Sequence, residues 1–116
     1  MSLQPIPETW RLAVISALRS KKYEATTDFL EKWQNDFPSS RLPILLDDFE
    51  IMLSSPLHGC LVTLGPPARL GETWEFWLIH ESQKAYAKIL LRADGKGVVL
   101  YSAHLPKFRY LKCELS

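Results

Sequence analysis

Four side chains in the second half of the chain could together bind an anion and move a proton. Tyr86, Lys88 and Arg92 recur at the two-residue period of a strand, which places a phenol and two permanent cations on one face of a sheet. His104 lies in the next apolar segment, and an imidazole exchanges a proton near neutral pH. Fixed cations beside such groups stabilise negative charge that develops during a reaction. These four residues are the candidate catalytic groups.

The register of the first strand pair decides which side chains share that face, because a slip of one residue reverses every side chain. A two-residue turn at Ser82-Gln83 would pair Phe76 with Ile89. The apolar face would then contain Trp74, Phe76, Leu78, Ala85, Ala87, Ile89 and Leu91. The opposite face would contain Trp77, Tyr86, Lys88 and Arg92.

The second hairpin decides where the imidazole lies. Asp94-Gly95 predicts a turn, because glycine adopts the positive φ that tight turns require. We favour a three-residue loop over residues 93–95, which pairs Tyr86 with Ser102 and brings His104 to the cationic face. A two-residue loop would place His104 on the apolar face instead.

The elements that must position these residues change type near the middle of the chain. Apolar residues recur at helical spacing within residues 10–18, 26–37 and 42–53, which predicts three short helices. The second half has the alternation typical of strands, with Phe108–Leu115 as a closing edge strand. The expected fold is a single α+β domain spanning residues 1–116. A helical layer (1–56) packs on one face of a twisted antiparallel sheet of about four strands (57–116).

Composition excludes several classes of protein. The 116 residues have a net charge of +1, which argues against strong nonspecific binding to nucleic acid. The charge is nevertheless uneven, at −2 over residues 1–56 and +3 over residues 57–116, so the second half is where an anion would bind. No apolar run is long enough to span a membrane, so we expect a cytoplasmic protein without a membrane partner. In that compartment Cys60 and Cys113 are expected to be free thiols.

Other chemistries find little support in the residue spacing. Gly95-Lys96-Gly97 lies in a hairpin rather than before a helix, so it is no phosphate-binding loop. Neither cysteine has a histidine at catalytic spacing, and Asp47-Asp48 are neighbours on a helix. We therefore expect no metal, no cofactor, and neither nucleotide-dependent chemistry nor a hydrolytic triad.

In segment order and spacing, the chain resembles the MqsR branch of bacterial endoribonuclease toxins. The matching segments follow the helices and are Thr73–Phe76, Tyr86–Ile89 and Val98–Ser102. In that branch an aromatic-x-Lys strand precedes a strand ending in Ser-Phe-Lys. Tyr86 and Lys88 match the first element, while Ser102 matches the second and His104 replaces the expected lysine. The branch shares a small α+β fold with RelE and, more distantly, with barnase and colicin D.

The resemblance implies metal-independent cleavage of single-stranded mRNA by the RNA's own 2′-hydroxyl. Such a reaction needs a base, an acid and positive charge near the phosphorane. Lys88 and Arg92 would stabilise charge, and His104 would act as acid or base with Tyr86 as its partner. The candidate RNA-binding residues are Trp77, Ser102, Lys107, Arg109 and Lys112. The implied protein partner is a cognate antitoxin, with the ribosome as a further candidate.

The same residues also fit a noncatalytic protein. Tyr86 is an ordinary strand former, and lysine and arginine at period two are typical of the solvent face of an antiparallel sheet. Trp77 opposite Lys88 could be a simple cross-strand pair. The alternative is therefore an interaction module, such as an immunity, antitoxin or adaptor protein, that binds a partner through Trp77 and Tyr86.

Overall fold

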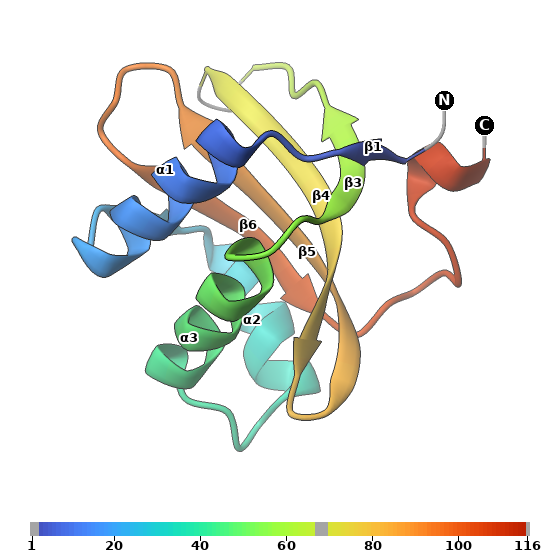
Figure 1. Cartoon of the computed structure of the whole chain (residues 1–116). Helices are drawn as coiled ribbons and strands as arrows, with labels where there is room; N and C mark the ends of the chain where they lie inside the picture. The colour runs from blue at the N-terminus through green and yellow to red at the C-terminus, as the bar shows by residue number, and fades with distance from the viewer. Residues whose placement is uncertain (1–2, 67–69, 116) are drawn as a thin grey trace.

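The structure, a computed structural model, describes residues 3–66 and 70–115, and these form an α+β fold (Figure 1). The three α-helices of this part of the chain are α1 (Glu8–Arg19), α2 (Thr27–Asp36) and α3 (Leu42–Leu53). Its strands are β1 (Gln4–Pro5), β2 (Tyr23–Ala25), β3 (His58–Val62), β4 (Gly71–His80), β5 (Gln83–Arg92) and β6 (Val98–His104). A short 3-10 helix, η1 (Lys112–Leu115), follows β6.

The three helices confirm the sequence prediction, and local chemistry explains where they begin and end. The Thr26 hydroxyl accepts a hydrogen bond from the Phe29 amide at 3.0 Å and caps α2. A proline lies in the first turn of α3, where its missing N–H costs nothing. The buried Arg11 guanidinium of α1 donates to the Leu53 carbonyl at 2.8 Å, so it covers the carbonyl end of α3.

The sheet has six strands in the described part of the chain, not about four, and it is mixed rather than antiparallel. The strand order is β1-β3-β4-β5-β6-β2, and β2 pairs with β6 in parallel. Both unexpected strands lie within residues 1–56, so that half is not only a helical layer. They have two and three residues, too few to show a period of two in the sequence. Gly97, at φ 118°, allows β2 to approach, because a Cβ there would collide with the Lys22 carbonyl.

The β4–β5 hairpin keeps the predicted faces although the turn lies one residue earlier than expected. Glu81 and Ser82 form the turn with φ of 50° and 62°, and His80 pairs with Gln83. Phe76 therefore faces Ala87 instead of Ile89. This two-residue shift in pairing leaves every side chain on its expected face.

The β5–β6 register differs from the favoured prediction, and a β-bulge compensates for the difference. Near the turn, Ile89 pairs with Leu100, which is the register of the rejected two-residue loop. The register then shifts at Tyr101, so that Lys88 pairs with Ser102. The extra residue of a bulge reverses the alternation of the side chains that follow it. His104 therefore reaches the predicted face and lies opposite Tyr86.

The helices cover one face of the sheet, and the hydrophobic core lies between the helices and that face (Figure 1). Aromatic packing includes the edge-to-face contact of Phe49 on α3 with Phe76 on β4, whose ring centroids are 6.2 Å apart. No helix in the described residues is long and apolar enough to cross a membrane. The core therefore fixes β4, β5 and β6 from one side and leaves their other face available.

Residues 105–115, here called the C-terminal strap, run along the sheet on the side away from the helices (Figure 1). The strap contains η1 and is not the edge strand predicted for Phe108–Leu115. A disulfide joins Cys113 of the strap to Cys60 of β3, which corrects the prediction of two free thiols. The sequence could not indicate this pairing, because 53 positions separate the two cysteines and only the fold brings them together.

Candidate functional site

Two cross-strand rows of side chains occupy the sheet face opposite the helices. The first row follows the pairing of Cys60 with Glu75, of Glu75 with Lys88, and of Lys88 with Ser102. The second row contains Trp77, Tyr86 and His104. Directly paired side chains in an antiparallel sheet lie about 5 Å apart at Cβ. The strands alone thus bring a carboxyl, a phenol, an ammonium and an imidazole together.

A pocket of about 700 Å³ opens above these rows, within the size range of small-molecule sites. The sheet forms its floor, the C-terminal strap forms one wall, and the first turns of α2 form another. Its floor residues are Glu75, Trp77, Tyr86, Lys88, Tyr101, Ser102 and His104. Its wall residues are Thr26, Asp28 and Lys32 of α2, and Pro106, Lys107, Phe108, Tyr110, Leu111 and Lys112 of the strap.

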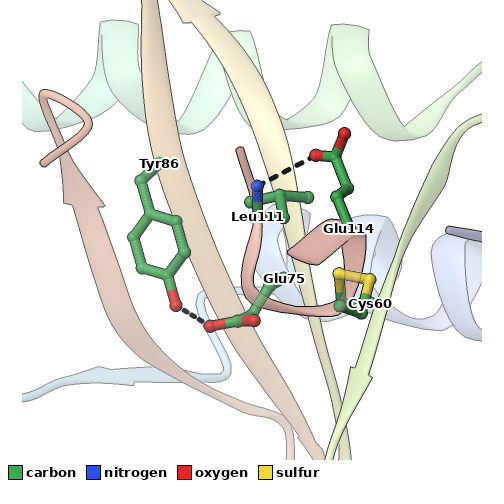
Figure 2. The surroundings of a disulfide bond; sticks show 6 residues. Cys60, Glu75, Tyr86, Leu111 and Glu114 are labelled. Carbon is green, nitrogen blue, oxygen red and sulfur yellow. Dashed lines mark hydrogen bonds between the residues drawn. A yellow bond between two sulfur atoms is a disulfide. The ribbon is translucent and has the colours of Figure 1, made fainter. Parts of the chain in front are cut away.

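Glu75 is the functional candidate that sequence reasoning missed. Its side chain is buried and accepts a hydrogen bond from the Tyr86 hydroxyl (Figure 2). Burial raises the pKa of Glu75 above its ordinary value, and the nearby charges of Lys88 and Lys112 oppose that rise. A carboxyl with a raised pKa is a stronger base at neutral pH than an ordinary glutamate. The signal was present in the sequence, because Glu75 alternates onto the face of Trp77.

His104 lies on the pocket floor with one ring nitrogen already occupied. Its Nδ1 donates to the Leu105 carbonyl at 2.8 Å, because a carbonyl oxygen can only accept. The proton that can exchange is therefore the one on Nε2. The ring centroid lies 5.2 Å from that of Tyr86, and the residue is only 7% exposed. This arrangement holds the imidazole in one orientation beside the Tyr86–Glu75 pair.

The predicted cations divide into those that line the pocket and those that do not. Lys88, Lys107 and Lys112 line it, and Lys88 Nζ lies 5.9 Å from the Tyr101 ring centroid. Lys32 of α2 also contributes, which the sequence did not suggest.

The two predicted arginines lie outside the pocket lining. Arg92 forms ion pairs with Glu24 at 2.9 Å and with Asp94 at 2.5 Å, beside the β5–β6 turn. Its hydrogen bond lowers the pKa of the Asp94 carboxyl. Arg109 stacks its guanidinium 5.7 Å from the Tyr110 ring centroid. The structure therefore does not bring either arginine together with Lys88 and His104.

Trp77 lies at the pocket edge, where its indole is partly exposed. Its ring meets that of Tyr86 edge-on at 6.4 Å, and the Lys84 ammonium lies 4.1 Å from its centroid. The ammonium therefore occupies one face of the indole, and Tyr86 packs against the same ring. A flat ligand that stacks on this indole would have to displace the Lys84 ammonium or use ring surface that Tyr86 leaves open.

A second set of polar side chains, here called the inner polar cluster, lies on the helix side of the sheet. Ser40 Oγ and Asp48 Oδ2 each lie 2.7 Å from a ring nitrogen of His80, at Nε2 and Nδ1 respectively. The Trp33 indole donates to Ser40 Oγ at 3.1 Å. The order serine, histidine, carboxylate is that of an acyl-transfer triad.

The burial of His80 argues against catalysis by the inner polar cluster. The His80 side chain is 0% exposed, and the Phe37 ring contacts it edge-on at 4.9 Å. A proton accepted at Nε2 could not be passed to a leaving group in such a closed site. The indole N–H also uses electron density that Ser40 would need for attack. We assign this cluster the structural role of joining α2, α3 and β4.

No family model matches the chain, and neither does any curated protein or solved structure. The geometry of the pocket is therefore what indicates a function. Within residues 3–66 and 70–115, no group of three or more histidine, cysteine or acidic residues is arranged to hold a metal ion.

Proposed function

We propose that the protein is a metal-independent endoribonuclease that cleaves single-stranded RNA, in the manner of the MqsR and RelE toxins it resembles. One observation carries the proposal. A buried carboxyl and an imidazole flank the same phenol on the floor of one pocket, and two lysines lie near that carboxyl. General acid–base catalysis needs one group that accepts a proton and one that donates it, and different environments give the two groups these different roles.

In this mechanism Glu75 is the general base. It accepts the proton of the ribose 2′-hydroxyl while the 2′-oxygen forms a bond to phosphorus. Its raised pKa strengthens it as a base, and the Tyr86 hydroxyl fixes its orientation. The bond from phosphorus to the 5′-oxygen then breaks, leaving a 2′,3′-cyclic phosphate.

His104 is the general acid. Protonated at Nε2, it donates that proton to the departing 5′-oxygen, and its Nδ1 bond to Leu105 keeps the ring in place. Lys88 and Lys112 stabilise the charge that develops on the phosphorane oxygens, a contribution of about 3 kcal/mol for a well-placed donor. Among the candidates named from sequence, Arg92 has no part in this mechanism, because it is held by Glu24 and Asp94.

The remaining pocket residues suit a nucleotide chain. Trp77 and Tyr101 offer aromatic rings for stacking, which single-stranded RNA recognition commonly uses. Ser102 can hydrogen-bond to the backbone, and Lys107 extends the positive charge along the strap. Arg109 guides RNA only from outside the pocket.

The biological setting belongs to the same proposal. We infer an mRNA-cleaving toxin of a toxin–antitoxin pair in the cytoplasm, with a cognate antitoxin as its protein partner and the ribosome as a further candidate. Covering the pocket would be sufficient for an antitoxin to inhibit, because the proposed catalytic residues line it.

A noncatalytic interaction module is the second candidate, and the rim of the pocket supports it. Phe108 is 73% exposed and Tyr110 is 47% exposed, although both are large apolar side chains. Exposed aromatic residues at a pocket rim are typical of protein-binding surfaces. An adaptor or immunity protein would use them without any reaction.

Cleavage in EDTA separates these two functions. Purified protein is incubated with single-stranded RNA and EDTA, and the product ends are identified by mass spectrometry. The nuclease yields 2′,3′-cyclic phosphate ends, while a folded sample that yields no product supports the interaction module. His104→Ala and Lys88→Ala should abolish both cleavage and growth arrest on expression. His58→Ala and Lys96→Ala remove the same groups from exposed positions outside the pocket lining and should leave both unchanged.

A further inference from the structure

The disulfide anchors the C-terminal strap directly beside the candidate base. Cys60 on β3 and Glu75 on β4 are cross-strand partners, so their side chains lie on the same face. Cys113 reaches Cys60 from the strap, with their Cα atoms 5.8 Å apart (Figure 2). The covalent bond therefore fixes the strap at the row that contains Glu75 and Lys88.

The strap supplies much of the pocket wall. Lys107, Phe108, Tyr110, Leu111 and Lys112 all line the pocket. Lys112 is adjacent in sequence to Cys113, and its charge acts on Glu75. Moving the strap would therefore remove two cations and an aromatic rim from the site in one step.

The strap forms hydrogen bonds at its beginning and within itself. The Leu105 amide donates to Asp36 at 3.0 Å, which fixes the start. Residues 106–110 are all exposed, and Leu111 is the buried residue that follows them. The Leu111 amide donates to Glu114 Oε1 at 2.9 Å (Figure 2). The Glu114 amide donates to the Leu111 carbonyl, also at 2.9 Å, and the two bonds close a turn inside the strap. Leu111 is not part of the main hydrophobic core cluster, so release of this segment would not require the core to unfold.

We propose that the Cys60–Cys113 disulfide is a reversible redox switch on this pocket. The oxidised bond holds the strap in place as the wall of the RNA site, and reduction releases the strap and weakens RNA binding. The inference rests on the proposed function for the identity of the ligand. A cytoplasmic location would supply the thiols, and intracellular disulfides are commonly transient and redox-sensing.

The exchange balances as ordinary thiol–disulfide chemistry. Two thiols of a reductant such as glutathione give up two electrons and two protons. The sulfur–sulfur bond of the protein breaks, each cysteine becomes a thiol, and the reductant becomes a disulfide. Glutathione disulfide reverses the reaction.

Limited proteolysis tests the release of the strap without reference to RNA. Thiol titration first confirms zero free thiols in the oxidised protein and two in the reduced protein. Trypsin is then added under native conditions, and cleavage after Lys107, Arg109 and Lys112 is followed by mass spectrometry. We expect these cleavages to be at least tenfold faster after reduction, and to slow again after glutathione disulfide. Cys113→Ser should behave as the reduced protein with or without reductant, and circular dichroism establishes that it is folded.

Binding of an uncleavable probe tests the effect on the pocket. A fluorescent single-stranded RNA 12-mer with 2′-O-methyl groups should bind the reduced protein and Cys113→Ser at least fivefold more weakly than the oxidised protein. Cys60→Ser, which leaves a thiol on the strap instead of the sheet, should match Cys113→Ser. The NMR signals of the His104 imidazole and the Trp77 indole report on the pocket without RNA, and both should shift on reduction.

These measurements separate failure of the switch from failure of the nuclease. Equal proteolysis in both redox states, or unchanged His104 and Trp77 signals, overturns the switch whatever RNA does. Release of the strap and a shift of both NMR signals support the switch. If the probe then binds neither redox state and RNA stays intact, the proposed nuclease is overturned while the switch stands.

Discussion

The two faces of the sheet each hold a histidine at the end of a strand, and the two histidines are placed for different work. His80 ends β4 on the helix side, with both ring nitrogens bonded and no exposed side-chain surface. His104 ends β6 on the opposite side, with Nδ1 bonded and the ring on the floor of an open pocket. Whether an imidazole can transfer a proton to a ligand thus depends on whether its surroundings leave a ring nitrogen accessible. The first holds elements together, and the second can exchange a proton with a ligand.

Their carboxyl partners differ in the same way. Asp48 contacts His80 directly at 2.7 Å and remains partly exposed. Burial raises the pKa of Glu75, which accepts its hydrogen bond from a phenol and has lysines only in its vicinity. A carboxylate that is paired in the inner polar cluster stabilises the fold. On the pocket side, a carboxyl that forms no direct ion pair keeps the basicity that a reaction could use.

Alanine substitution at each histidine should separate the two roles. The loss of RNA cleavage in one of these variants is the largest effect that we expect. His104→Ala removes the proposed general acid and should lower the RNA cleavage rate by about 10²- to 10⁴-fold. It should lower the free energy of unfolding by roughly 1–2 kcal/mol, because one hydrogen bond and the packing of a mostly buried ring against Tyr86 are lost. His80→Ala should lower that free energy by about 2–4 kcal/mol, since it leaves a cavity and unpaired partners.

Each variant is the control for the other. The RNA cleavage rate of His80→Ala should equal that of the native protein. Both rates are measured well below the unfolding temperature of the variant and are divided by the concentration of folded protein. Loss of cleavage in both variants, with equal loss of stability, would show that the two histidines have the same structural role.

Removal of the disulfide should affect the pocket side and spare the helix side. The bond closes a loop of 53 residues, and the chain-entropy relation gives about 4 kcal/mol of stabilisation for that length. The Cys60→Ala, Cys113→Ala double variant should therefore unfold at a lower denaturant concentration. Hydrogen exchange should rise in residues 105–115 and stay unchanged at the His80 amide in mild conditions. Uniform acceleration over the whole sheet would contradict a strap that is held separately from the core.

Glu75→Gln should lower activity and raise stability. Cleavage falls because an amide cannot accept the 2′-hydroxyl proton, while unfolding free energy rises by roughly 1 to 2 kcal/mol at pH 8 because a buried charge is removed. The folded pKa of Glu75 lies above its ordinary value of 4.5, so the carboxyl stabilises the fold below pH 4.5. That contribution is lost as pH rises through the folded pKa.

The pH dependence supplies the check on Glu75. Denaturant titrations of both proteins should agree at pH 4 and diverge toward pH 8, where the native protein is the less stable. The divergence should be absent between the native protein and Glu72→Gln, which changes a carboxyl on the same strand outside the pocket lining. A Glu75→Gln variant that is less stable at pH 8 would mean that the carboxylate is stabilised by its lysines.

Sequence periodicity was sufficient for the elements that have long apolar patterns. The three helices and the strands β4, β5 and β6 each span seven residues or more, enough to show their period. Strands β1 and β2 span two and three residues and form only because β3 and β6 offer partners. Their existence depends on tertiary contacts that no local pattern encodes.

The site was predictable in part for a similar reason. Tyr86 and Lys88 share a face by alternation alone, as the sequence indicated, whereas Ser102 reaches that face, like His104, only beyond the bulge. His104 shares that face only because of the bulge at Tyr101, so the prediction was right despite a wrong register. The strap and its disulfide could not be predicted, because they depend on long-range packing.

The smallest effect should come from Ser40, the residue that gives the inner polar cluster the order of a triad. Ser40→Ala removes a hydroxyl that bonds His80 and Trp33, and its position near the surface lets water replace part of both bonds. We expect a loss of about 1 kcal/mol or less in unfolding free energy and no change in RNA cleavage. The native protein should also fail to react with a fluorophosphonate, because buried His80 cannot complete proton transfer. Covalent labelling of the native protein that disappears in Ser40→Ala would contradict the structural role of the inner polar cluster, because buried His80 would then activate Ser40 as a nucleophile.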